Sequence, residues 1–475
     1  MRIKSQDIEI DEENIFLNDK IGREEEIVNL STLAESLDSP FVLSLNSPWG
    51  TGKTTFTRLW VAHLRKSAKS VVYFNAWETD FSEDPLLAFL GEIDEDFQKF
   101  LGHSDASAAA WEKAKIVGSK IARRSVPAIL KIATAGILDA KDLVEEQAAE
   151  VLAGLSEDSI EAYLSQKSAI AEFKESVAAA ITRSDGSGPI VIFVDELDRC
   201  RPTYAIALLE RIKNIFDVSG LVFVLSVDLE QLAHSIEAVY GQNFDAREYL
   251  KRFIDIDYSL SPPKRKGFIS HLFATYGIET FFEKRRKNSS LQYESEHLFN
   301  TFEILSEWEK MSLREIEQIF GQIHLVLRAT PRNKFLFPAL VVFLVVLKRK
   351  QPKTYEEFTN GVDGLELAIS YLHSLAPTVD RVANFSAMLV EGFLIAAKYQ
   401  HLSENDEIIQ KYIDFVKSQD GTHEEREYAE RVARIAMKPT DDLRGQINLA
   451  SISSRINMFA RFDFSPGEEE SSEQE

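Results

Sequence analysis

Short apolar runs alternate with stretches of helical periodicity along much of the first half of the chain. The runs lie at 41–45 (FVLSL), 69–77 (KSVVYFNAW), 190–194 (IVIFV) and from 220 onward (GLVFVLSV). Their centres are continuous rather than alternating, as expected of strands that are buried on both faces of a parallel sheet. The segment FTRLWVAHL, which comes shortly after the first run, has apolar residues at helical spacing. The pattern therefore predicts a three-layer α/β core in which a parallel sheet lies between helices.

The strand–helix alternation is interrupted once and then ends, which divides the 475 residues into segments. Residues 1–83 contain an acidic leader and the start of the core. Residues 84–182 are rich in Ala, Glu and Lys at helical spacing and predict a helical insertion, after which 183–262 complete the core. We expect 263–461 to be mostly helical, and the charged, weakly hydrophobic stretch 462–475 to be a disordered tail.

The segment NSPWGTGKTT at 46–55 joins the first predicted strand to a helix and resembles the phosphate-binding pattern G-x-x-x-x-G-K-[ST], the Walker A motif. Glycines let backbone N–H groups approach phosphates closely, and the following helix offers free N–H groups and a positive dipole end. Lys53 is expected to face the β- and γ-phosphates and Thr54 to coordinate Mg²⁺. The predicted nucleotide-binding residues of this loop are Ser47, Pro48, Trp49, Gly50, Thr51, Gly52, Lys53, Thr54 and Thr55.

This loop departs from the pattern at one position, because Ser47 stands where the first glycine is expected. Gly50 inside the loop can supply part of the lost flexibility. Taken alone, the segment also fits an ordinary strand–turn–helix with a surface lysine, so a second element has to decide.

That second element is PIVIFVDELDRC at 189–200, a continuous apolar run that ends in Asp195 and Glu196, as in a Walker B motif. A carboxylate at the end of a buried strand beside a phosphate loop is placed to hold Mg²⁺, and Glu196 can then polarise the attacking water as general base. Asp198 is a weaker candidate for either role. The alternative is a strand end solvated by charges, but the two motifs in this order favour a nucleoside triphosphate site.

A third apolar run stops at Ser226 and Asp228. A polar group at this point, such as Ser226, could sense the γ-phosphate or orient water. Asp228 could equally well cap the helix that LEQLAHSIEAVY predicts, and the residues leave both readings open.

Taken together, five segments resemble the KAP family of P-loop NTPases: SPWGTGKTTF, VYFNAWETD, VIFVDELDRCRP, VFVLSVDLEQL and EYLKRFIDIDYSL. The segment NDKIGREEEIVNL resembles a box that such proteins carry near the base and ribose, which implies a nucleotide-contacting role for Arg23. SLREIEQIF and TPRNKF resemble a helical lid with a nucleotide-sensing arginine. Many members also carry transmembrane helices between the two Walker motifs, and this chain does not. The resemblance implies ATP rather than GTP, Mg²⁺, and work in signalling assemblies or in bacterial defence against phages.

ATP hydrolysis in this fold is often completed by an arginine that reaches the γ-phosphate. The candidates are Arg252 in YLKRF, Arg314 in SLREIEQ and Arg332 in TPRNKF. We expect Arg314 to be a sensor on the lid and Arg252 to act in trans on a neighbouring subunit, which requires a homo-oligomer. For each of them the alternative is an ordinary charge on a helix surface.

The composition excludes some classes of protein. A net charge of −22 argues against a broad nucleic-acid surface, and a single cysteine rules out an internal disulfide and is consistent with the cytoplasm. The apolar stretches 126–138 and 335–347 are shorter than the roughly 20 residues of a spanning helix, so we expect no membrane insertion. The second is expected to be a buried helix entered through Pro338.

Three functions fit these motifs. The first is an Mg²⁺-dependent ATPase that acts as a switch or motor in an assembly, with partners bound through the helical C-terminal region. The second is a nucleotide-binding scaffold with little turnover, which the serine at position 47 favours. The third is a small-molecule kinase, for which the sequence offers no recognisable acceptor pocket.

Overall fold

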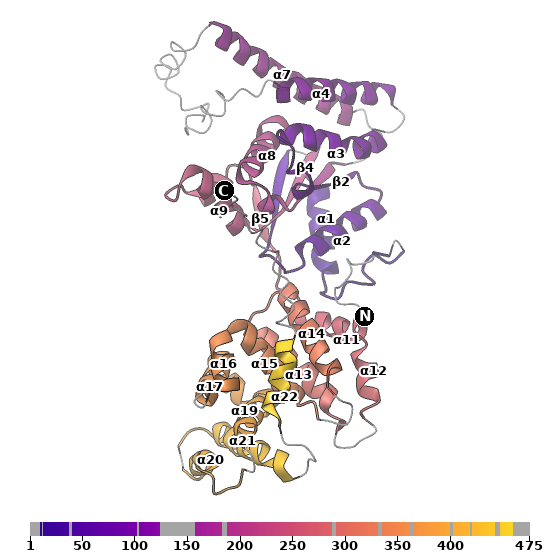
Figure 1. The fold of residues 1–475 in the computed structure, drawn as a ribbon. Coiled ribbons are helices and arrows are strands. Elements are labelled where there is room, and N and C mark those ends of the chain that lie inside the picture. Colours follow the sequence, from indigo (N-terminus) through magenta and orange to yellow (C-terminus); the bar gives the residue numbers. More distant parts are fainter. Residues whose placement is uncertain are drawn as a thin grey trace, which may run out of the picture. The chain divides into compact units, whose positions relative to one another are not determined.

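A computed structural model describes residues 10–11, 13–37, 40–101, 104–123, 157–182, 188–286, 291–330, 335–361, 364–399, 402–418, 420–441 and 447–458. The chain divides between Pro262 and Pro263 into two compact units, Asp7–Pro262 and Pro263–Glu475 (Figure 1). The predicted tail and the apolar stretch 126–138 lie outside the described residues.

In the first unit, the described residues form a sheet of five parallel strands in the order β2-β3-β4-β1-β5. The four predicted runs are confirmed as strands, and β5 is an edge strand whose residues are mostly exposed. The strands are β1 Phe41–Asn46, β2 Val71–Asn75, β3 Ile190–Asp195, β4 Leu221–Val227 and β5 Ile256–Ser259. The α/β class and the parallel sheet agree with the prediction from the continuous apolar runs.

Helices cover both faces of this sheet because alternate side chains of the buried strands point to opposite sides. On β3, Val191 and Phe193 join the core under α1 and α2, whereas Ile192 and Val194 join the core on the other face. Figure 1 shows the resulting three layers. The helices are α1 Glu24–Glu35 and α2 Lys53–Lys66 on one face, and α3 Pro85–Phe100, α8 Pro202–Ile215, α9 Leu229–Tyr240 and α10 Ala246–Leu250 on the other.

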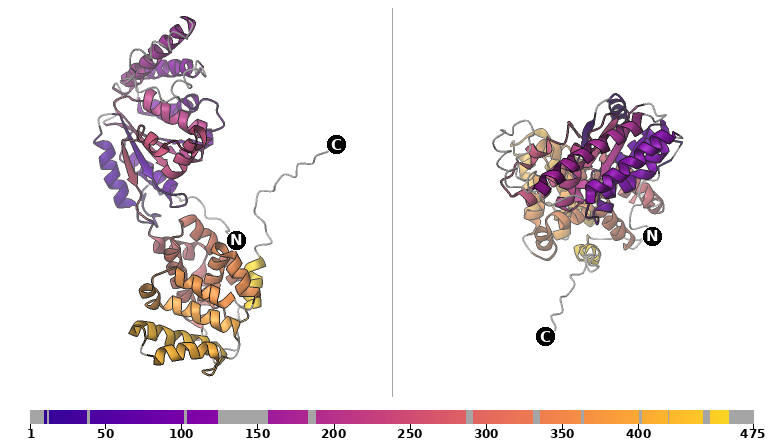
Figure 2. Two further views of the ribbon diagram at one scale, coloured as in Figure 1. Left: turned by 90° about the vertical axis from the view of Figure 1, so that its left-hand side faces the viewer. Right: turned by 90° about the horizontal axis from the view of Figure 1, so that it is seen from above.

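The helical segment after β2 has two parts. Its first helix, α3, is a layer of the core, and Phe89 packs against the sheet residues Phe74 and Phe223. The next helices, α4 Asp105–Arg123 and α7 Glu157–Thr182, run side by side and pack on α3 and α8 (Figures 1 and 2). The helix α3 buries its apolar face against the sheet and therefore belongs to the core. The inserted part of the chain begins only after α3.

The second unit is helical in all its regular described elements. Its α15 is buried from Pro338 to Leu347, as expected for a core helix, and no helix among the described residues has the length and apolar character needed to cross a bilayer. The helices are α11 Arg265–Thr275, α12 Ile278–Glu283, α13 Glu294–Trp308, α14 Leu313–Arg328, α15 Pro338–Lys350, α16 Pro352–Asn360, α17 Gly364–Ser374, α18 Thr378–Val382, α19 Phe385–Lys398, α20 Glu407–Lys417, α21 His423–Asp441 and α22 Leu449–Met458.

One buried carboxylate links four helices of this second unit. Glu391 on α19 accepts hydrogen bonds from His373 Nε2 at 2.7 Å, from the Tyr412 hydroxyl at 2.6 Å and from the Tyr428 hydroxyl. These donors lie on α17, α20 and α21, so a single side chain 2% exposed ties their packing together. Burial would raise the pKa of Glu391, but these hydrogen bonds and the charge of His373 lower it.

Candidate functional site

The predicted polar positions lie together at the edge of the sheet that is formed by the carboxyl ends of β1, β3 and β4. The strand register aligns Ser226 with Leu45 on one side and with Asp195 on the other, and Asp195 with Asn75. The Walker A loop, here residues 47–52, leaves β1 at the same edge and leads into α2. Segments that lie far apart in the sequence therefore converge where parallel α/β sheets bind their ligands.

The Walker A loop uses its two glycines for left-handed backbone conformations, with φ of 80° at Gly50 and 90° at Gly52. Ser47 does not have a positive φ, so this position does not require glycine. Its N–H donates to Val227 O at 3.2 Å, and its hydroxyl lies 2.6 Å from Thr51 Oγ1, which donates to Pro48 O. The serine therefore closes the loop with a side-chain hydrogen bond that glycine could not make.

Lys53 is the first residue of α2 and is only 8% exposed. Its Nζ donates to Ser47 O at 3.0 Å and lies 3.6 Å from Asp198 Oδ2. Burial lowers the pKa of Lys53, and the charges of Asp198, Asp228 and Asp195 oppose this shift. A buried cation at the end of the loop, near several carboxylates, is suited to binding an anion that replaces some of those contacts.

Asp195 is fully buried at the end of β3. The Tyr73 hydroxyl donates to its Oδ2 at 3.0 Å, and the Glu196 N–H donates to its Oδ1 at 2.9 Å. Burial raises the pKa of Asp195, and hydrogen bonds from Ser226 and Tyr73 oppose that rise. Tyr73 was not among the predicted site residues. Its place in β2, two residues before the strand end at Asn75, is the sequence signal that could have revealed it.

Glu196 has a left-handed backbone, with φ of 60° and ψ of 22°, which is uncommon for a residue other than glycine. Its Oε1 lies 2.8 Å from Arg199 Nη1, and the Arg199 guanidinium lies 5.8 Å from the centre of the Trp77 ring. Burial raises the pKa of Glu196, whereas Arg199 lowers it. A raised pKa brings a carboxylate closer to the range of an efficient general base.

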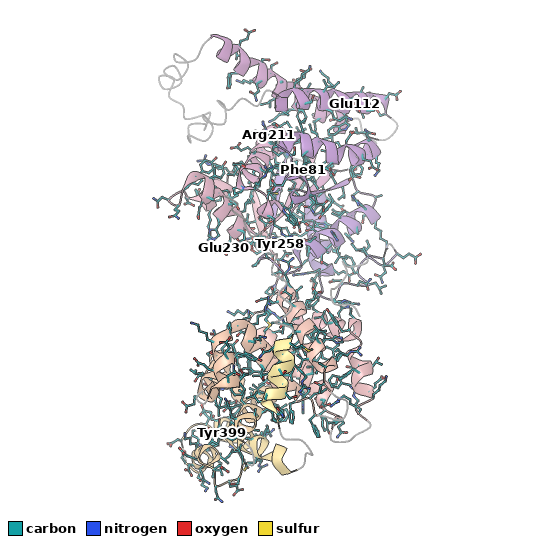
Figure 3. All side chains as sticks on the ribbon, viewed as in Figure 1. Phe81, Glu112, Arg211, Glu230, Tyr258 and Tyr399 are labelled. Carbon is teal, nitrogen blue, oxygen red and sulfur yellow. The ribbon has the colours of Figure 1, made fainter. Side chains whose placement is uncertain are left out.

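Asp198 lies in the short 3-10 turn Leu197–Arg199, and its side chain is only 1% exposed. Its Oδ2 accepts the Trp49 indole N–H at 2.6 Å and the Asp228 N–H at 3.0 Å. Its Oδ1 is buried and has no hydrogen-bond partner. The side chain of Asp228 caps α9 by accepting from the N–H groups of Glu230 and Gln231, so the capping interpretation of Asp228 is confirmed. Glu230 marks this end of α9 in Figure 3.

A cavity of about 550 Å³ lies against the start of the Walker A loop. Its walls come from β1, α9, α10 and β5, and it has both acidic and basic residues. The lining residues are Asn46, Ser47, Pro48, Asp228, Leu229, Glu230, Arg247, Leu250, Lys251, Ile254, Asp255, Asp257, Ser259 and Leu260. The loop is therefore bordered by space large enough for a small molecule.

The sequence model of the KAP family P-loop domain matches residues 24–330, which is more than half of the chain and includes the five described strands and both Walker segments. The chain belongs to the KAP family of P-loop NTPases. The family resemblance and the fold class inferred from the sequence are thereby confirmed, and nucleotide binding at the Walker segments is the property that this family implies.

A search of the solved structures found similarity to the Aeropyrum pernix ORC2 protein in its ADP form, with 14% identity over 96% of this chain and 95% of that chain. The TM-score is 0.24, so this similarity carries no argument about fold or function. A search of the curated proteins gave no match.

In this KAP NTPase, the buried side chain of Arg23, the residue just before α1, contacts the chain that follows β5. Its Nη1 donates to Ser261 O at 2.8 Å and to Glu26 Oε2 at 2.7 Å, and Tyr258 on β5 (Figure 3) donates to the same carboxylate. The guanidinium lies 5.8 Å from the Phe56 ring of α2, and its Nε and Nη2 have no hydrogen-bond partner. Arg23 therefore lies close to the helix that carries Lys53, and its contact with the nucleotide stays a prediction.

The other three predicted arginines lie in three different parts of the chain. Arg252 is exposed and lies just after α10. Three residues later, the N–H of Asp255 donates a hydrogen bond to Val42 O near the start of β1. Arg314 is exposed on α14 in the second unit, where Ser312 and Glu315 form a capping box. Arg332 lies outside the described residues.

The residues at this edge fit an Mg²⁺ ion that arrives with a nucleotide. Among the described residues, no group of three or more His, Cys, Asp or Glu side chains could hold a metal by itself. Mg²⁺ bound with a nucleotide does not need such a group, because phosphates and waters fill most of its positions and one or two carboxylates suffice. Asp195, the Thr54 hydroxyl and the unpartnered oxygen of Asp198 are suitable oxygen ligands.

Proposed function

We propose that this chain binds ATP with Mg²⁺ and hydrolyses it to ADP and phosphate. The observation that supports this most is the convergence of four groups at one sheet edge: buried Lys53 at the start of α2, Asp195 at the end of β3, and Glu196 and Asp198 just after it. ATP rather than GTP follows from the family alone.

Each residue has a distinct role in this proposal. Backbone N–H groups of the Walker A loop and the start of α2 bind phosphate oxygens, and Lys53 neutralises charge between the β- and γ-phosphates. Thr54 and Asp195 hold Mg²⁺, which when bound neutralises charge on the phosphate oxygens. Glu196 accepts a proton from the attacking water, and Ser226, which accepts a hydrogen bond from Thr57 at 3.0 Å, is near enough to Asp195 to orient that water.

A nucleotide-binding scaffold with slow turnover is the second candidate, and one observation favours it. Glu196 is paired with Arg199 and Lys53 is paired with Asp198, so both groups needed for hydrolysis are engaged with neighbouring charges. Ser47 no longer argues for this candidate, because its position does not require glycine. Steady-state phosphate release separates the two functions.

The larger role that we propose is a nucleotide-dependent switch or motor within a homo-oligomer or with a partner protein at the helical second unit. A defence role against phages rests on the family resemblance alone. It would be seen as fewer plaques on cells that express the chain than on cells that express its Lys53→Ala variant.

The test of the proposed activity uses Lys53→Ala and Asp195→Ala with Lys66→Ala as a matched control. Lys66 is an exposed cation at the other end of α2, so its loss leaves the loop intact. We expect both site variants to lose ATP binding, measured by calorimetry, or hydrolysis, measured by phosphate release, while the control keeps both. Hydrolysis at the wild-type rate in both site variants would contradict the assignment.

A further inference from the structure

Asp198 contacts the Walker A loop, the start of α2 and the residue that follows β4. Its Oδ2 lies 2.6 Å from the Trp49 indole nitrogen, 3.6 Å from Lys53 Nζ and 3.0 Å from the Asp228 nitrogen. Trp49 and Lys53 stand on either side of the two loop glycines, so this one oxygen contacts both arms of the loop. The first of these contacts joins residues 149 positions apart in the chain.

The other oxygen of Asp198 is buried and lacks any hydrogen-bond donor. A buried carboxylate oxygen without a donor is unfavourable, because the water that it loses on folding is not replaced. Such an atom beside a phosphate-binding loop is suited to a ligand that supplies positive charge or a water proton. The Mg²⁺ of a bound nucleotide, with its water shell, supplies both.

We propose that Asp198 is a latch that holds the Walker A loop through Trp49 and Lys53, and that it opens for a nucleotide carrying Mg²⁺ rather than for the nucleotide alone. This inference rests on the proposed ATPase site. A free nucleotide would place its phosphates beside a buried carboxylate, and like charges repel strongly where water is excluded. With Mg²⁺ present, Lys53 would be free to neutralise the phosphates and the positive charge of the metal would balance Asp198, so neither charge would be left alone.

The test compares ATP binding in EDTA and in Mg²⁺ for the wild type and Asp198→Asn, measured by calorimetry on the full chain. The amide has the same shape and an acceptor for Trp49, but it has no charge. We expect Asp198→Asn to bind ATP in EDTA about tenfold more tightly than the wild type and to gain about tenfold less from Mg²⁺. A merely structural role would instead weaken binding equally in both conditions, and that result would overturn the proposal, as would unchanged affinities.

Fluorescence of Trp49, whose residue is 45% exposed, gives a second measurement that does not depend on the Asp198 variant folding. Adding Mg²⁺ to ATP-saturated protein should change the fluorescence of the wild type and of Trp77→Phe, but not of Trp49→Phe. Trp77 is a matched control, because it is also half-exposed at this edge and contacts Arg199 rather than Asp198. The same response in all three proteins, or in none, would contradict the latch.

Failure of the latch can be told from failure of the proposed function. If ATP binds and Asp198→Asn has the Mg²⁺ dependence of the wild type, only the latch is wrong. If ATP binds neither with nor without Mg²⁺, the nucleotide site itself is wrong, and the latch is overturned with it.

Discussion

Glu196 and Arg199 form an ion pair within the candidate site, with 2.8 Å between Oε1 and Nη1. The two residues are three positions apart, and the left-handed backbone of Glu196 starts the tight turn that brings them together. The proposed general base is therefore held by a cation of its own chain. This pair makes it possible to test the role of Glu196 in two separate ways.

The first prediction is that Glu196→Gln binds ATP but hydrolyses it slowly. The amide keeps the shape of the side chain and loses the ability to accept a proton, so kcat should fall by about 10²–10⁴-fold. Phosphate release and ATP binding, measured on the same preparation, check this. A loss of less than about tenfold would move the role of the base to Asp198 or to a partner protein.

The second prediction concerns the pH dependence of hydrolysis in Arg199→Ala. The charge of Arg199 lowers the pKa of Glu196, so its removal should raise that pKa further above its ordinary value. The base works only when deprotonated, so the acidic limb of the kcat profile should move to higher pH.

Two variants control for this experiment. Arg199→Lys keeps the positive charge and should keep a profile close to that of the wild type. Arg201→Ala removes an arginine that pairs with Asp80 instead of Glu196 and should leave the limb in place. If Arg199→Ala also keeps the wild-type profile, the pair does not tune the base.

The third prediction is that Arg252 acts on a neighbouring subunit. It is exposed and follows α10, the last helix before β5, so it is accessible to a neighbouring subunit. We expect hydrolysis per subunit to rise with protein concentration, and a mixture of Arg252→Ala and Lys53→Ala chains to regain part of the activity. A specific activity that is independent of concentration, together with an inactive mixture, would rule out this arrangement.

The fourth prediction concerns the helical unit, where Glu391 joins four helices. Replacing it with Gln should lower the free energy of unfolding at pH 7 by about 1–3 kcal/mol, because its three donors lose a charged acceptor. The folded-state pKa of Glu391 is lowered, so its stabilising effect exists above the unfolded pKa of about 4.3 and is lost as the pH falls through the folded value.

Urea unfolding at pH 7 and at an acidic pH below the folded-state pKa of Glu391 should therefore show a smaller difference between wild type and Glu391→Gln at the lower pH. Glu404→Gln, an exposed carboxylate that precedes α20, is the matched control and should be nearly neutral at both values. An equal destabilisation at both pH values would mean that the charge of Glu391 contributes nothing.

Much of the fold could be predicted from local patterns. The buried strands were recognisable as continuous apolar runs, and the α14 capping box and the buried α15 were recognisable from neighbouring residues. β5 was not recognisable in this way, because an edge strand with mostly exposed residues has no such run. The Walker residues followed from spacing, since a phosphate loop needs its glycines, lysine and hydroxyl within one short segment.

The sequence by itself thus determined most of the elements, the family and the residues that precede or follow the four buried strands. Only the tertiary structure decided that Tyr73 donates to Asp195, that Trp49 donates to Asp198 and that Ser226 lies beside Asp195. Each of these contacts joins segments from different strands, and their meeting depends on strand order and register. Local periodicity carries no information about either, because it reports which face of an element is buried and not which element covers it.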